Sequence, residues 1–152
     1  MELGVFDQVA DAVRGLVPPE LGSFRTQARR WGLKAWFDLD ECPRAHYEAQ
    51  VVSAKHVPGA EVLAIEVGFH LEHPDDRENA AGLRPLVAAE ASWREELGPD
   101  AVAGPFLGRK GWCRLSEAWI DPDLGDPELC FELADRLAAY VAVVEPLRTD
   151  RR

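Results

Sequence analysis

Two histidines and two glutamates in the first half of the chain have the residue types and the spacing to hold a metal ion. His46 and Glu48 are two residues apart, and so are His70 and Glu72. Residues at this spacing point to the same face of a β-strand. Imidazole nitrogens and carboxylate oxygens are common ligands of first-row divalent metals. The sequence therefore offers a metal site, provided that the two segments lie side by side.

The segments around both pairs have the alternation of half-buried strands. From residue 61 onward, apolar side chains fall on one side of the pattern, while His70 and Glu72 fall on the other. The apolar set is Leu63, Ile65, Val67, Phe69 and Leu71. Residues 45–52 alternate more weakly, and Pro58-Gly59 is typical of a turn. We expect a β-hairpin over residues 45–73, with all four histidines of the chain in it.

The register of this hairpin decides which side chains meet, because a slip of one residue turns a strand over. A short loop over residues 58–60 would place apolar residues opposite apolar ones, so we prefer it. The expected pairs are Tyr47 with Leu71, Glu48 with His70, and His46 with Glu72.

Two interpretations of the polar face follow from this register. In the first, His46, Glu48 and His70 are metal ligands, while Glu72 orients a histidine or acts as a base. In the second, the face is open to solvent and its opposite charges pair across the strands without a metal. The second interpretation is the more common outcome for histidine and glutamate pairs without a sequence motif.

Composition favours a single domain over residues 1–152 in a reducing compartment. The net charge of −10 disfavours nucleic acid and anionic membranes as partners. Three scattered cysteines, an acidic N-terminus and no apolar run of about 18 residues indicate a cytoplasmic protein without a signal peptide or membrane span. The wealth of alanine and arginine is typical of a bacterial genome rich in GC. Apart from the divalent metal, no cofactor is expected.

The remaining elements are read from periodicity and from proline and glycine. We expect a first helix over 3–17, a loop or short helix over 20–32, a first strand over 33–39, a β segment over 101–120 with a turn at 108–111, and a last helix that begins at Asp126. Residues 76–97 are expected to be helical with an interruption near Gly82 and Pro85, so that the main second helix runs from Arg84 to Leu97. The predicted fold is α+β: an antiparallel sheet of four to five strands with helices packed on one face, in the order α-β-β-β-α-β(-β)-α.

Basic residues beside a tryptophan stand out between residues 20 and 32. Arg25, Arg29, Arg30 and Trp31 could contact phosphate or single-stranded nucleic acid. Because the cluster is short and the chain is acidic, we expect a solvated helix face.

Two families resemble the chain in element order. The order α-β-β-β-α-β-β-α is similar to the secretion-chaperone-like fold, which implies a small, acidic, dimeric protein that binds polypeptides without catalysis. The order α-β-β-β-α-β is also similar to the restriction-endonuclease-like core, which needs two acids and a lysine around a divalent ion. Here Asp38 and Glu48 would supply the acids, and Gln50 stands where that family has lysine.

The sequence leads to two hypotheses about function. The first is a non-enzymatic cytosolic binding or adaptor module that contacts a protein partner or forms a homodimer; its five tryptophans could supply an exposed contact patch. The second is a metal-dependent hydrolase or nuclease-like enzyme, in which a metal-bound water on the 45–73 hairpin attacks the substrate.

Overall fold

The computed structural model describes residues 4–148 and has an antiparallel sheet of six strands with four α-helices, which confirms the α+β class. In order across the sheet, the strands are β1 (Phe24–Arg29), β2 (Gly32–Phe37), β3 (Ala45–Ser53), β4 (Leu63–Leu71), β6 (Cys113–Ile120) and β5 (Val102–Pro105). The helices are α1 (Val5–Arg14), α2 (Asp76–Ala88), α3 (Glu90–Leu97) and α4 (Leu129–Val144). Short 3-10 turns span Pro19–Leu21, Ala54–His56 and Glu145–Leu147.

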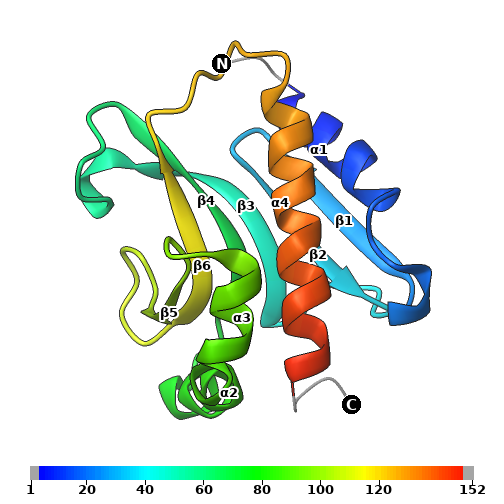
Figure 1. Ribbon diagram of the computed structural model, residues 1–152, viewed down its shortest axis with the longest axis vertical. Helices are drawn as coiled ribbons and strands as arrows, with labels where there is room; N and C mark the ends of the chain where they lie inside the picture. Colours follow the sequence, from blue (N-terminus) through cyan, green and yellow to red (C-terminus); the bar gives the residue numbers. More distant parts are fainter. Residues whose placement is uncertain (1–3, 149–152) are drawn as a thin grey trace.

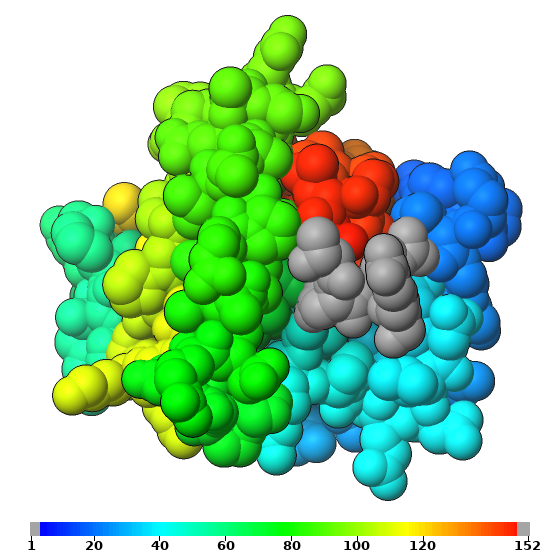
Figure 2. Space-filling view, turned by 90° about the horizontal axis from the view of Figure 1, so that it is seen from below, coloured from blue at the N-terminus to red at the C-terminus, as the bar shows by residue number. Residues whose placement is uncertain are grey.

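The helices cover one face of the sheet, and the core lies between them and the strands (Figure 1). Alternate residues of β4, including Ile65, Val67 and Phe69, are buried there, as the period-two pattern predicts. Leu133 and Leu137 of α4 pack in the same cluster. In the view from below, α2 lies beside the C-terminal end of α4 (Figure 2). No helix within residues 4–148 is both long and apolar enough to cross a bilayer.

The sheet has one strand more than the four to five expected, because residues 24–29 form β1 and not a loop or short helix. Phe24 and Ala28 pack against the core, while Arg25 and Arg29 are exposed on the other face. The inward residues of β1 include Thr26, so the strand lacks a regular apolar alternation that the sequence could show. The next strand, β2, ends at Phe37 before Asp38, which has a left-handed φ of 66°.

The helix boundaries also differ from those expected. Residues 76–97 are helical as expected, but the interruption is not at Gly82 or Pro85, because α2 runs from Asp76 through Pro85 to Ala88. The break comes at Ala89, from which α3 runs to Leu97 as a separate helix. Asp126 does not start α4 directly: its carboxylate accepts a hydrogen bond from the backbone N–H of Glu128 (2.9 Å), and the α-helix begins at Leu129. The capping residues in the sequence correctly predict a turn before α4, but they do not predict which residue is the first of the helix.

The central hairpin is present, but its predicted register is wrong by two residues. Tyr47 lies opposite Phe69, His46 opposite His70, and Glu48 opposite Gly68. The cause is a longer connection: a 3-10 turn at Ala54–His56 precedes Pro58-Gly59, and pairing resumes only at Leu63. A shift of two keeps every side chain on its predicted face, since strand side chains have period two.

Gly68 sits in the middle of the polar face, where β4 and β6 approach closely. Its φ is 155°, and a Cβ at this position would lie 2.4 Å from the backbone oxygen of Leu115 and 2.6 Å from the Cα of Ser116. Backbone atoms cannot yield as a flexible side chain can. This close approach of β6 to β4 therefore requires glycine at position 68.

We expect Gly68→Ala to lower the free energy of unfolding by at least about 2 kcal/mol, because it combines backbone strain with a clash against backbone. Chemical denaturation measures the change. Gly104→Ala in β5 is the matched control, since a Cβ there meets nothing within 4 Å; it should cost less than about 0.5 kcal/mol. Equal stabilities of the two variants would contradict the close approach of β4 and β6 at Gly68.

Candidate metal centre

His46, Glu48, His70 and Glu72 lie together on the sheet face opposite the helices. His46 and Glu48 belong to β3, His70 to β4, and Glu72 follows β4 directly. Their exposed fractions are 2%, 6%, 0% and 8%. The expectation of a solvated face is therefore wrong for this part of the sheet. Buried histidine and carboxylate side chains must be paired with each other or with a cation.

The inner atoms of the four side chains form a ring in which nitrogen and oxygen alternate. His46 Nε2 lies 2.9 Å from Glu48 Oε1, which lies 3.2 Å from His70 Nδ1. His70 Nδ1 lies 3.0 Å from Glu72 Oε2, and 3.6 Å separate that oxygen from His46 Nε2. All four atoms lie within 4.8 Å of one another.

These separations are close to those around a first-row divalent ion. Ligands bonded at about 2.1 Å to one ion stand roughly 3.0–3.5 Å apart. The ring needs only small adjustments to bind an ion at its centre. Glu72, expected to orient a histidine or to act as a base, offers an oxygen to the ring.

The outer nitrogen of each histidine has an acceptor of its own. His46 Nδ1 donates to the backbone oxygen of Pro43 at 2.8 Å, and His70 Nε2 lies 2.7 Å from Glu66 Oε2. A carbonyl or carboxylate at this place keeps the proton on the outer nitrogen, so the inner nitrogen is the one available to a metal. The two rings are thus oriented as in known metal centres, where a carboxylate or carbonyl supports each ligand histidine.

Glu66 is the site residue that the sequence analysis missed. It is completely buried, and its other oxygen accepts a hydrogen bond from Gln50 Nε2 at 3.0 Å. The signal was present, since Glu66 lies four residues before His70 on the same strand face. Gln50, which stands where the endonuclease-like pattern has lysine, supports Glu66 through this hydrogen bond. The Pro43 carbonyl could not be inferred, because its position depends on the loop before β3.

The pairings control the charge of the cluster. Burial acts to lower the pKa of His46, but hydrogen bonds to Cys42 and Glu48 and the charge of Glu72 outweigh it and raise the pKa to about 9. The pKa of His70 is also raised, since Glu66, Glu48 and Glu72 together overcome its complete burial. Burial acts to raise the pKa of Glu48, but its hydrogen bonds to both histidines lower it to about 2.

Apolar side chains from the β5–β6 connection cover this part of the sheet. The Phe106 ring stands edge-on to His70 with centroids 4.8 Å apart, and Trp112 packs on Phe106 at 5.5 Å. Leu107 packs beside Val52 and Ala64 further along the same face. The remaining exposure of the cluster lies on Glu48 and Glu72, on the side toward β2, where Lys34 Nζ is 4.0 Å from Glu72 Oε1.

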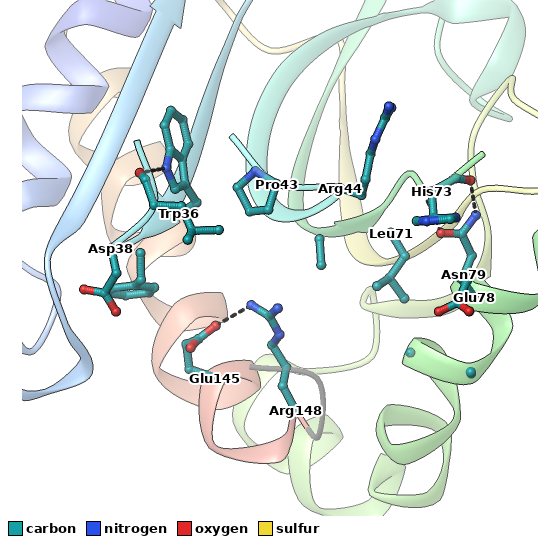
Figure 3. Close-up of a pocket in the computed structure, with 15 residues that line it drawn as sticks. Trp36, Asp38, Pro43, Arg44, Leu71, His73, Glu78, Asn79, Glu145 and Arg148 are labelled. Carbon is teal, nitrogen blue, oxygen red and sulfur yellow. Dashed lines mark hydrogen bonds and ion pairs between the residues drawn. The ribbon is translucent and has the colours of Figure 1, made fainter. Parts of the chain in front are cut away.

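None of the four ring residues lines either of the two main cavities. A cavity of about 570 Å³ lies between α2, the end of α4 and the start of β3, and Figure 3 shows its lining residues. A second of about 530 Å³ lies between α2 and β5.

Other residues considered in the sequence lie away from the ring. Asp38 lines the cavity of Figure 3, and its Oδ1 accepts a hydrogen bond from the Ser23 backbone N–H at 2.8 Å. It does not join Glu48 in the ring, as an endonuclease-like pair of acids would require. His73 Nδ1 accepts from the Asp75 backbone at 3.0 Å, and His56 packs near Gly108. Two of the four histidines thus belong to the site.

No family model, curated protein or solved structure matches the chain. The chemistry that the site can perform therefore rests on its own geometry.

We expect His46 in the metal-free protein to titrate at about pH 9, well above its ordinary value of 6.5. NMR of the labelled imidazole measures this directly. Glu48→Gln should lower the pKa of His46, because it replaces a carboxylate with a neutral amide. Since the folded pKa exceeds the unfolded one, the stabilising contribution of this proton is complete below pH 6.5 and is lost as the pH rises toward 9. Titration of His46 near pH 6.5 would contradict the paired geometry.

Proposed function

We propose that this protein binds a divalent transition metal, with His46, Glu48, His70 and Glu72 as its ligands. The observation that carries the proposal is the placement of both histidine rings. Their outer nitrogens are held by Pro43 and Glu66, so their inner nitrogens converge with two carboxylate oxygens.

Charge balance supports this assignment. In the metal-free cluster, two protonated histidines face the ring carboxylates Glu48 and Glu72. One divalent ion carries the same charge as the two protons on the inner nitrogens. Exchange of the two protons for the ion leaves the net charge of the buried cluster unchanged. A metal would therefore enter without an uncompensated charge, which is the main obstacle to placing an ion in a protein interior.

The ligand set favours zinc, manganese or iron, since imidazole suits zinc and iron and carboxylate suits manganese. Four protein ligands complete the coordination of a structural zinc site, whereas catalytic sites keep a position open. The burial of all four ligands therefore favours a role in binding or stability over metal-dependent hydrolysis. This proposal keeps the non-enzymatic class of the first hypothesis and takes its metal site from the second. A protein partner or a homodimer remains a prediction.

We expect zinc, manganese, nickel or ferrous iron to raise the melting temperature of the metal-free protein. Free metal at one hundred times the dissociation constant adds about 2.7 kcal/mol to the free energy of unfolding. Thermal shift and elemental analysis of the dialysed protein measure binding and stoichiometry, which should be one ion per chain. His70→Ala should abolish the effect.

Matched variants separate loss of ligands from loss of folding. Glu72→Gln keeps the side-chain volume and should still weaken binding strongly. Glu66→Gln keeps all four ligands and should weaken binding by about ten- to a hundredfold, because it removes the support of His70. His56→Ala removes a histidine outside the ring and should bind as the unaltered protein does. Equal shifts in all four variants would place any bound metal elsewhere.

Metal binding at neutral pH should release two protons, one from each inner histidine nitrogen, because both pKa values are raised. Calorimetric titrations in buffers of different ionisation enthalpy measure the number. The apparent affinity should then rise about a hundredfold per pH unit over the range where both histidines are protonated. Release of no protons would mean that the histidines are neutral in the metal-free protein.

A further inference from the structure

The sheet face that holds the ring continues onto β1 and β2, where it is exposed and basic. Arg25 and Arg29 of β1 are exposed on this face, and so in part is Lys34 of β2, with a side-chain exposure of 37%. No acidic residue occurs between residues 21 and 37 in a chain whose net charge is −10. The region that was expected to be a solvated helix face is therefore a strand-borne basic surface.

One transverse row joins this basic surface to the ring. Gln27 lies opposite Lys34, Lys34 opposite Glu48, and Glu48 opposite Gly68. Directly opposed side chains on a sheet stand about 5 Å apart at Cβ. Lys34 is thus the neighbour of the ring on its more exposed side, with its Nζ 4.0 Å from Glu72 Oε1.

The cations of this surface are not needed to balance the buried cluster. The two ring carboxylates are balanced by two protons or one divalent ion, and Glu66 has the charge of Arg114 nearby. Lys34, Arg25 and Arg29 add positive charge beyond this balance, and Lys34 Nζ also lies 4.0 Å from Glu72 Oε1. The exposed Asp40 is 3.7 Å from Arg25 and weakly offsets it. The exposed half of the face is therefore locally positive.

This positive region suits a small anion better than a long one. Exposed charges act over about 8–10 Å at physiological ionic strength, so a small ligand senses chiefly the local cations. A polymer would extend over more of the protein, whose net charge of −10 would repel it. Arginine and lysine both bind phosphate oxygens through charge-assisted hydrogen bonds.

We propose that the exposed half of this face binds a small phosphate-bearing molecule, with its phosphate held by Lys34 beside the metal centre. The inference rests on the proposed metal site and names the class of ligand that reaches it. Lys34 is a binding residue in this scheme, and Arg25 and Arg29 hold the rest of the anion. Lys34 also discriminates against cationic ligands at the exposed side of the ring.

The test uses the full chain loaded with manganese, whose unpaired electrons broaden the phosphorus NMR signal of a phosphate bound nearby. Inorganic phosphate is the probe. We expect strong broadening with the loaded protein, and an apparent phosphate affinity about tenfold lower in Lys34→Met. Lys55→Met is the matched control, because it removes an exposed lysine in the turn after β3 and should leave broadening unchanged.

Each outcome decides a different point. If manganese binds but broadening is the same in Lys34→Met and Lys55→Met, the inference is wrong and the metal site stands. If thermal shift shows no binding of manganese, zinc, nickel or ferrous iron, the proposed function fails and the inference falls with it. If a labelled oligothymidylate binds more tightly than phosphate, with an affinity that falls steeply as salt increases, the surface binds nucleic acid and the small-molecule assignment is overturned.

Discussion

On the sheet face opposite the helices, the folded structure depends on the neutralisation of buried carboxylates. Glu48, Glu66 and Glu72 are at most 8% exposed, and an unpaired charge in such a place would strongly destabilise the folded state. His46, His70 and Arg114 supply the compensation from the same and neighbouring strands. The close approach of β4 and β6 at Gly68 and the packing of Phe106 over His70 are consistent with this requirement. Both exclude water from a cluster that satisfies its own hydrogen bonds.

Other buried acids in the protein show why this cluster differs. Glu117 accepts hydrogen bonds from Arg136, Tyr140 and Trp119, which fixes α4 against β6. Glu145 accepts from Tyr47 and Arg148 at the end of α4.

The donors of Glu117 and Glu145 keep their protons at neutral pH, since burial and nearby charge raise the pKa of both tyrosines and arginine is always charged. These acids are structural anchors. In the ring the donors are histidines, and histidine is the donor that can exchange its proton for a metal.

The sequence predicts which face of the sheet each side chain of the central strands occupies, but it does not predict how the two strands pair. Alternation in β4 placed His70 and Glu72 on the polar side, and a two-residue slip leaves that assignment intact. Whether the polar side was open or covered could not be inferred, because the cover comes from Phe106 and Leu107, far along the chain. The same limit hid β1, whose inward residues are too mixed to show a period. Glu66 lies on the polar side of the same alternation, but its role appears only once the orientation of the His70 ring is known.

Charge neutrality also constrains what metal loading could do. Two protons and one divalent ion contribute equally to the field at the surface, so the exchange would leave the basic surface of β1 and β2 unchanged at long range. The change would be local: hydrogen bonds of 2.9–3.6 Å around the ring would give way to shorter coordinate bonds. These bonds join β3, β4 and the residue that follows β4. Metal loading would therefore act through the rigidity of the central strands and through contact with a bound anion, and not through the overall charge of the protein.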